Sequence, residues 1–471
     1  MDVAKLTSNL KTALIAQGIA FALSLMTSFI VPKLLGITEF GYWQLFLLYS
    51  SYVGFFHFGI NDGVYLIHGG ETREELDNGS IKSQFVLGIA GQSTIAVLIA
   101  AYCLLVVPDL DRVFVLIACC IFLIINNAAG FLGFVFQAIN ETKVFSHSLM
   151  LEKCSFLVEL VFLVVLQVDV FQLYILGYVL SRFVALGYCL FKARTILSGD
   201  FIGIRLALTE LFTSIKVGIK LTLSNVASML IIGFGRFLIE GTWGIDSFGE
   251  VSFALSIVNF FIVFMSQLSM VLFPALRQSS KEELEKAFGI LANLLNVLLP
   301  ISFIAYYPIC YLLSIWLPQY TQSFIYLAIL LPLCIYNTKM DIQGTTYSKV
   351  LREEKLLLRT NIISVVSAIL LGIIAAVFLR SIEAVVISML LAVQFRAVFL
   401  ETHFATKCKC NRSLQTISLL VISYLFIAIA LVFGTITGIP LVLVLLAFYY
   451  VVNRKSLAEV FAWIKERIAT K

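Results

Sequence analysis

Charged residues are scarce in this chain: Asp, Glu, Lys and Arg make up only 13% of its 471 residues, whereas 60% are hydrophobic. So little polar side chain cannot cover the surface of a water-soluble globule of this size. The composition therefore excludes a water-soluble globular protein, and it indicates a protein embedded in lipid.

Residues that carry common catalytic chemistry are also few. The 4 histidines are scattered, and neither an HExxH nor a GxxxxGK[ST] motif occurs. Cys408 and Cys410 lie close together on a basic loop, but structural zinc needs four ligands and only His403 is near. We therefore expect no catalytic residue, no ATP-driven pump, no cofactor and no metal site.

Hydrophobic segments of about 20 residues, the length that crosses a bilayer, recur along the whole sequence. Such segments must be helical, because lipid cannot satisfy free backbone polar groups. The sequence therefore predicts an all-α integral membrane protein with about 14 transmembrane helices. The expected spans are 12–31, 40–61, 84–107, 113–136, 149–168, 171–191, 218–239, 250–275, 287–307, 322–338, 361–379, 382–400, 414–434 and 437–452.

The basic residues indicate how these spans are oriented. Most of the 33 Lys and Arg residues lie at the termini or in alternate connections, and only Lys33, Arg112 and Arg380 fall in the opposite connections. By the positive-inside rule, both termini are predicted to be cytoplasmic. The net charge of +5 is then a topological signal, so we expect no nucleic-acid partner.

Two short phrases are repeated in the same order. Gly36–Gly41 (GITEFG) is echoed by Gly244–Gly249 (GIDSFG), and QAINETKV at 137–144 is echoed by QGTTYSKV at 343–350. The two copies of each phrase are separated by nearly the same number of residues. Two such matches indicate a duplication of about 200 residues. We therefore predict two pseudo-symmetric six-helix lobes and two additional C-terminal helices, an arrangement in which transporters place a pathway between the lobes.

This duplication defines the expected domains. The N-lobe with the first six spans covers residues 1–192, and a cytoplasmic connection covers 193–217. The C-lobe covers 218–400, and residues 401–471 hold the last two spans and a basic tail. Six spans are an even number, so both lobes enter the membrane in the same direction and their symmetry axis is expected along the membrane normal.

Charges inside spans are the best clue to a site, because each costs at least about 2.5 to 3.5 kcal/mol to insert. Arg236, late in the seventh span, is the strongest case. It can pair with Glu240 one helical turn later and reach the outer interface, or it can face a central cavity. Both interpretations stay open at the level of sequence.

Other basic residues in or near the ends of spans are weaker candidates for a binding site. Arg182 and Arg396 hold equivalent positions in the sixth and twelfth spans, and both can reach the cytoplasmic interface. Lys33 and Lys339 follow the ends of spans and are interpreted as interface anchors rather than ligands. Arg182 and Lys33 are nevertheless kept with Arg236 as candidate substrate-binding residues.

Acidic and amide side chains complete the candidate set. Glu159 lies deepest, in the middle of the fifth span, and is a candidate proton-coupling group or ion-pair partner. Asp62 follows the second span, where it can also cap the next helix. Asn126 and Asn127, in the fourth span, either hydrogen-bond between helices or line a wet cavity.

The first repeated phrase carries a family resemblance. Leu34–Trp43 (LLGITEFGYW) resembles the LG-x-x-x-FG-x-[YW] turn of the polysaccharide-repeat flippases (Wzx-type) of the multidrug/oligosaccharidyl-lipid/polysaccharide (MOP) exporter superfamily. The duplicated twelve-span core, the two extra spans and the Gln-x5-Lys-Val segments are similar as well. Members of this family often have Asp-Arg late in the seventh span, whereas here Gly235 precedes Arg236.

The resemblance implies a flippase that moves polyprenyl-pyrophosphate-linked oligosaccharides, such as O-antigen repeat units, to the outer leaflet by alternating access. In this reading Arg236, Arg182, Lys33, Asn126 and Asn127 bind the pyrophosphate or sugars in a central cavity. The second set, Glu159, Glu240 and Asp62, serves in ion pairs or in coupling. The resemblance further implies a location in a bacterial cytoplasmic membrane and H+ or Na+ as a coupling ion. The implied partners are membrane lipids and polysaccharide assembly proteins.

Two other functions remain open. An ion-coupled multidrug or metabolite antiporter of the same superfamily needs an acidic cation site in the first lobe, for which Glu159 is the one deep candidate. A membrane glycosyltransferase or polymerase needs a large external segment with catalytic carboxylates. The longest expected external connection, 307–323, has no acidic residue.

Overall fold

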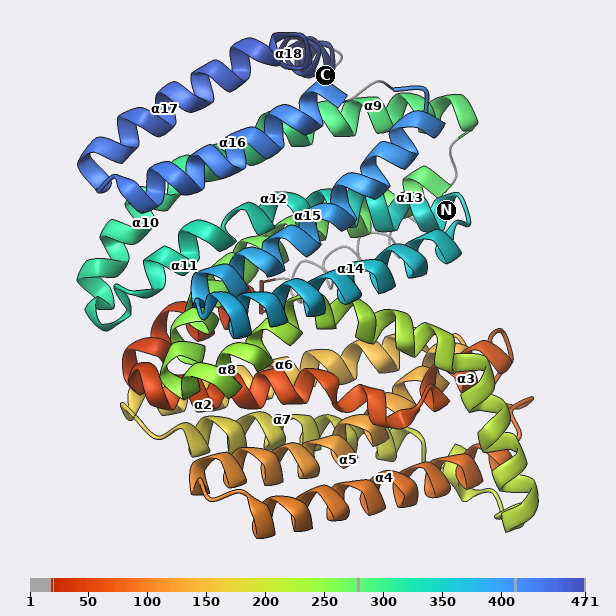
Figure 1. Ribbon diagram of the computed structural model, residues 1–471. Helices are drawn as coiled ribbons and strands as arrows, with labels where there is room; N and C mark the ends of the chain where they lie inside the picture. The colour runs from red at the N-terminus through yellow and green to blue at the C-terminus, as the bar shows by residue number, and fades with distance from the viewer. Residues whose placement is uncertain (1–17, 20, 278–279, 411–412, 470–471) are drawn as a thin grey trace. The chain divides into compact units, whose positions relative to one another are not determined.

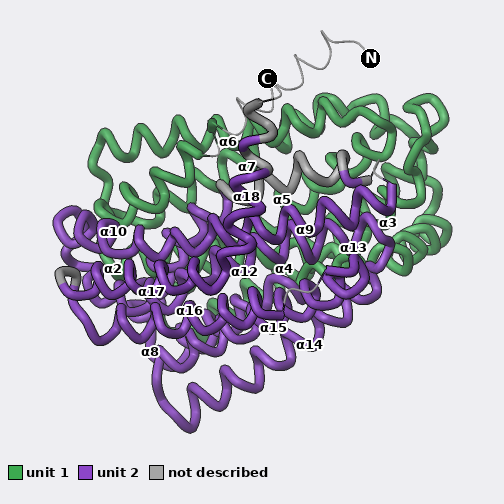
Figure 2. The backbone as a smooth tube through the Cα atoms, turned by 90° about the horizontal axis from the view of Figure 1, so that it is seen from above, with its two compact units in different colours: residues 1–226 green, residues 227–471 purple. Residues whose placement is uncertain are grey.

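The computed structural model describes residues 18–19, 21–277, 280–410 and 413–469. All regular elements among them are helices, which confirms the predicted all-α fold. The chain divides into two compact units, residues 1–226 and 227–471, which Figure 2 shows in two colours. The four-part division at 192, 217 and 400 stays a prediction.

The described part of the first unit contains six α-helices and the beginning of α8 (Figure 1). In the bundle, α7 packs against both α5 and α6, while α5 also contacts α2, α3 and α4. The helices are α2 (Val31–Tyr52), α3 (Ile60–Ile67), α4 (Asn78–Val106), α5 (Leu110–Ala138), α6 (Thr142–Val165), α7 (Phe171–Lys192) and the beginning of α8 (Ile204–Arg277).

The second unit continues α8 and adds the remaining helices (Figure 1). Here α15 packs against α11, α12 and α14, while α17 contacts α10 and α16. The helices are α9 (Lys281–Leu298), α10 (Ser302–Trp316), α11 (Ser323–Leu330), α12 (Pro332–Lys339), α13 (Thr346–Val350), α14 (Glu354–Ile374), α15 (Ile382–Lys407), α16 (Ser413–Val432), α17 (Thr435–Val452) and α18 (Arg454–Ala469).

Ten helices in the described chain are long and apolar enough to cross a membrane, and a helix pair bent by 78° at Asn453 makes an eleventh candidate. Two of the ten, Phe21–His57 and Ile204–Val263, each overlap two of the expected spans, and residues 12–17 and 20 of the first expected span lie outside the described residues. The fifth expected span corresponds to α6, which carries several charges. Each of the expected spans therefore overlaps a helix within the described part of the chain.

The repeated phrase marks the same structural event in both units. The helical path breaks at Gly36 in α2 and at Gly244 in α8, and each glycine has a positive φ. This conformation is accessible to glycine at little cost but strains other residues. The repeat inferred from GITEFG and GIDSFG thus corresponds to the same break in the helix in both units.

The second repeated phrase was aligned incorrectly. Residues 137–144 span a turn, whereas 343–350 lie in a π-helical segment and α13. The matching turn of the second unit comes later, at Arg352 and Glu353. There the amide of Glu353 donates to the carbonyl of Ser348 (2.7 Å), as that of Glu141 donates to Phe136 (2.7 Å). The similar letters of the two phrases therefore do not mark the same structural position in the two units.

The beginning of α8 is held tightly within the first unit. A Cβ on Gly63 would lie 2.0 Å from the carbonyl oxygen of Ser214, and one on Gly218 would lie 2.0 Å from that of Gly59. Only residues without side chains permit such a close crossing of two helices. Ser214 also donates to Gln84 Oε1 (2.7 Å), so part of the expected inter-lobe connection is packed against α3 and α4.

Candidate functional site

The structure places the candidate residues in several separate surroundings. Arg236 is half-buried in the second unit, where its Nη2 donates to Ser252 Oγ (3.0 Å). Its guanidinium lies over the Phe248 ring, with 5.0 Å between Cζ and the ring centroid. Glu240, one turn further along α8, is buried. The arginine is thus oriented by both a hydrogen bond and a cation–π contact.

Arg182 and Asn126 lie together in the first unit. Arg182 forms an ion pair with Glu152 of α6, and its Nη2 also donates to the backbone oxygen of Asn126 (3.5 Å). Asn127 is buried, and its Nδ2 donates to the carbonyl of Val53 (2.9 Å). For Asn127, the structure therefore shows helix-to-helix hydrogen bonding, one of the two roles expected from the sequence.

The equivalent arginine of the second unit is buried rather than turned towards an interface. Arg396 is 7% exposed, and it donates to Ser228 Oγ (2.8 Å) and to Asn337 Oδ1 (3.4 Å). The expectation that Arg396 snorkels is therefore wrong. In both units, an arginine late in the bundle contacts an asparagine of a central helix, Asn126 in α5 or Asn337 in α12.

Lys339 is not an interface anchor. Its Nζ lies 2.6 Å from Glu401 Oε1, and the two side chains are 1% and 2% exposed. Nζ also donates to Asn296 Oδ1 (3.0 Å), whose backbone oxygen accepts from Tyr449 (2.9 Å). The ion pair therefore joins α12 to α15 and, through Asn296, to α9 and α17.

The remaining basic candidate and the acid after the second span lie elsewhere. Lys33 is exposed near the beginning of α2. Asp62 is buried in the first turn of α3 and accepts a hydrogen bond from Thr222 Oγ1 of α8 (2.6 Å). Asp62 therefore fastens the glycine crossing of α3 and α8, which gives it a structural role in addition to any part in coupling.

Glu159 lines a groove of about 690 Å³ between α5, α6 and α7. Its Oε1 accepts a hydrogen bond from Ser155 Oγ (3.1 Å). Apart from Glu159 and Gly177, the lining consists of apolar side chains. The carboxylate of Glu159 is thus a predicted candidate that lies at a cavity within the described part of the first unit.

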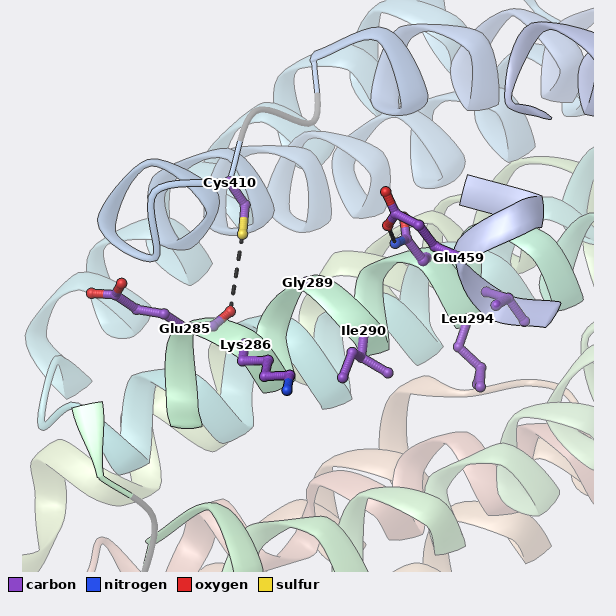
Figure 3. Close-up of a pocket in the computed structure, with 9 residues that line it drawn as sticks. Glu285, Lys286, Gly289, Ile290, Leu294, Cys410 and Glu459 are labelled. Atoms are coloured by element: carbon purple, nitrogen blue, oxygen red, sulfur yellow. Dashed lines mark hydrogen bonds between the residues drawn. The ribbon is translucent and has the colours of Figure 1, made fainter. Parts of the chain in front are cut away.

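A smaller cavity of about 200 Å³ lies in the second unit between α9 and α18 (Figure 3). Its two carboxylates are engaged: Lys409 donates to Glu285 Oε2 (3.3 Å), and Asn293 donates to Glu459. Cys410 Sγ is directed at the carbonyl oxygen of Glu285 at 4.0 Å. None of the predicted site residues lines this cavity.

Sequence reasoning missed Glu152, Glu401, Asn296 and Asn337, each of which contacts a basic side chain inside a bundle. Glu152 lies at the beginning of the fifth expected span, and Glu401 directly follows the twelfth. The presence of a charge at these places was the available signal. The partner of each residue could not be predicted from the spacing of residues in the sequence.

Comparison with known proteins defines the fold. No protein-family model matches the sequence, and no curated protein matches it significantly. Among solved structures, it resembles a lipid II flippase, MurJ, in an inward closed conformation. The TM-score is 0.62 at 10% identity, over 95% of this chain and 98% of MurJ. The chain therefore shares the fold of this flippase.

A second solved structure agrees with this assignment. An inward-facing multidrug resistance transporter of the MATE family, from the MOP superfamily, matches with a TM-score of 0.58 and 13% identity. This match covers 83% of the chain and 94% of the transporter. With its apolar helices, the chain is therefore a multi-pass membrane protein of MOP fold, as the resemblance implied.

Proposed function

We propose that this MOP-fold protein is a flippase for polyprenyl-pyrophosphate-linked oligosaccharide repeat units, moving them from the cytoplasmic to the outer leaflet for surface polysaccharide synthesis. The observation that carries the proposal is the extent of the fold match. The lipid II flippase aligns with 95% of this chain, whereas the multidrug transporter aligns with 83%. The Leu34–Trp43 motif, which resembles the Wzx-type flippases, adds independent support.

A protein is needed for this step because sugars cannot cross lipid unaided. Each unpaired hydroxyl loses several kcal/mol of hydration in an apolar medium, roughly 4 to 8 on a hydrocarbon scale. A polar pathway removes that cost, and alternating access keeps it closed at one end. We expect no covalent chemistry in the cycle, so the protein is proposed to be a transporter and not an enzyme.

Arg236 is the proposed contact for the pyrophosphate. Its guanidinium is partly accessible and is oriented by Ser252 and Phe248. Arginine binds phosphate oxygens in a two-point geometry that lysine cannot reproduce. Arg182 and Lys33 are proposed as secondary contacts and Asn126 as a sugar contact, whereas Asn127 is engaged in packing.

The proposed setting is the cytoplasmic membrane of a bacterium, with both termini inside. Outward movement of an anionic head group is then favoured by about 2.3 kcal/mol per charge per 100 mV. Exchange with H+ or Na+ is the other candidate driving force, with Glu159, Glu240 and Asp62 as the coupling candidates. Partners would be the lipid-linked oligosaccharide, membrane lipids and polysaccharide assembly proteins.

Disruption of the gene in its native host tests the proposal. We expect completed lipid-linked repeat units to accumulate on the cytoplasmic leaflet and surface polymer to be lost. Rescue with Arg236→Ala should fail and rescue with Arg236→Lys should be partial. Arg380→Asn, which removes one exposed positive charge at a left-handed residue that asparagine tolerates, should rescue fully.

Two results would redirect the assignment. Unchanged glycolipids together with altered sensitivity to drugs or metabolites would favour a multidrug or metabolite antiporter, for which the MATE-family match and the Glu159 carboxylate are the supporting observations. Glycosyl transfer by the purified protein would favour a glycosyltransferase or polymerase. Full rescue by Arg236→Ala would reject the proposed role of that residue.

A further inference from the structure

A small polar cavity lies between three helices of the first unit. Asn61 of α3, Gln92 of α4 and Asn127 of α5 line it, and the rest of the lining consists of apolar side chains and Gly88. The volume of the cavity is about 10 Å³. One water molecule needs roughly 10 to 15 Å³. The cavity therefore has room for a single water and not for a larger molecule.

The three amide side chains are buried, and one of them needs a donor. Asn61, Gln92 and Asn127 are 3%, 6% and 2% exposed. Oε1 of Gln92 has no hydrogen-bond partner within the described residues. Asn127 Nδ2 donates to the carbonyl of Val53 (2.9 Å), but an amide oxygen has two lone pairs and can accept more than one hydrogen bond. Because a buried acceptor without a donor costs free energy, the wall of the cavity at Gln92 favours a polar occupant.

The cavity adjoins a break in the second expected span. The 3₁₀-helical segment Val53–His57 is followed by Phe58 and Gly59, whose φ values are 49° and 91°, and α3 then begins at Ile60. Irregular backbone inside a bilayer is tolerated where protein buries it or where water reaches it. Asn127 already satisfies one carbonyl of this break, that of Val53. A polar site at the beginning of α3 is therefore consistent with the needs of the backbone there.

We propose that this cavity binds one water molecule, which donates to Gln92 Oε1 and bridges to the amides of Asn61 and Asn127. Water offers both donors and acceptors, and buried waters make about 3 hydrogen bonds to such groups. An ion fits less well, because no charged residue of the described chain lines the cavity and an unpaired ion is costly to bury. The bound water joins α3, α4 and α5 beside the broken span, whichever cargo the protein carries.

Radiolytic labelling of the full-length protein in nanodiscs tests this site. X-ray pulses convert water into hydroxyl radicals, which oxidise adjacent side chains, and mass spectrometry locates the oxidised residues. Phe131 lines the cavity and Phe122 does not, although both lie on α5 and both are 4% exposed. We expect at least about threefold more oxidation at Phe131, because there the radical forms within contact distance of the ring. Equal oxidation of the two rings would overturn the proposal without requiring any variant.

Gly88→Ala should displace the water. A Cβ at Gly88 would lie 3.8 Å from Ile60 Cδ1, which is an ordinary contact, so the methyl group fits and fills the cavity. Oxidation of Phe131 should then fall to the level of Phe122. Gly91→Ala is the matched control on α4, since a Cβ there meets nothing within 4 Å, and it should leave the labelling unchanged. Retained labelling in Gly88→Ala, or equal loss in both variants, would refute the assignment.

Two further measurements identify the acceptor and the occupant. Gln92→Leu removes the acceptor and should lower the oxidation of Phe131, whereas Gln92→Glu keeps an acceptor oxygen and should retain it. Unchanged labelling in Gln92→Leu would reject the proposed role of Gln92. Replacement of Na+ and K+ by choline should leave the labelling of Phe131 as it was. A loss that is restored when either cation returns would show an ion site and would overturn the proposal of water.

Discussion

Gly36 and Gly244 share one backbone conformation: φ is 73° with ψ at −174° in the first, and φ is 85° with ψ at −174° in the second. This region of conformational space is occupied essentially by glycine alone, and other residues pay about 1 to 3 kcal/mol to enter it. Both glycines begin the repeated phrase. The duplication therefore preserves a helix break that depends on the absence of a side chain.

The first prediction concerns these two glycines. Gly36→Ala and Gly244→Ala should each destabilise the protein by about 1 to 3 kcal/mol. The cause is backbone strain alone, because a Cβ at either position meets no atom within 4 Å. Thermal unfolding of the purified protein, followed by labelling of its buried cysteines, measures the effect.

Gly241 offers the matched control for this prediction. A Cβ at Gly241 also meets nothing within 4 Å, and the residue lies in helical conformation three positions before Gly244. Gly241→Ala should be neutral or stabilising by up to about 1 kcal/mol, because alanine favours helix. Equal melting temperatures for Gly241→Ala and Gly244→Ala would contradict the argument from strain.

The second prediction concerns the buried Lys339–Glu401 pair. Lys339→Met or Glu401→Leu alone leaves one charge buried without its partner and should cost about 3 to 5 kcal/mol. The double variant replaces the pair by apolar side chains and should recover most of that loss. A double-mutant cycle on thermal unfolding checks this. Additive losses in the double variant would mean that the two side chains do not stabilise each other.

The third prediction contrasts two ion pairs of different burial. Arg182 and Glu152 are 12% and 19% exposed, whereas Lys409, which pairs with Glu285, is 76% exposed. Glu152→Gln should therefore destabilise the protein by about 3 kcal/mol, because it leaves the arginine charge in a poorly solvated site. Lys409→Ala should change stability by less than about 1 kcal/mol. Similar melting temperatures for both variants would disprove the contrast.

The fourth prediction concerns pH. Burial alone would raise the pKa of Glu353, but hydrogen bonds from Lys407 and His403 outweigh it and hold this pKa below its ordinary value of 4.5. The depressed value means that Glu353 stabilises the fold above about pH 4.5 and that this contribution is lost as the pH falls through the lower, folded pKa.

Comparison of melting temperatures tests the pH prediction. Glu353→Gln should melt below the unmodified protein at about pH 7, and the difference should shrink steadily towards about pH 3. Glu74→Gln, which removes an exposed loop carboxylate, serves as the control and should show a smaller difference at neutral pH. A Glu353→Gln difference that stays constant across this range would contradict the sign of the shift.

The sequence by itself determined the helices and the points where they break. Apolar segments of bilayer length must be helical, because no water is present to satisfy the backbone, and this reasoning located a span wherever a long helix is found. The two glycines of the repeated phrase could be read in the same way, because a glycine between two apolar segments indicates a turn. Both inferences depend on local chemistry alone.

Only the tertiary structure decided which charges meet. Hydropathy locates a residue along a span but does not determine the rotation of its helix or the identity of its neighbours. Arg396 and Lys339 were therefore expected at an interface, whereas packing buries both and supplies Asn337 and Glu401 as partners. Glu159 likewise lies against Gly177 of another helix, a pairing set by side-chain packing between helices.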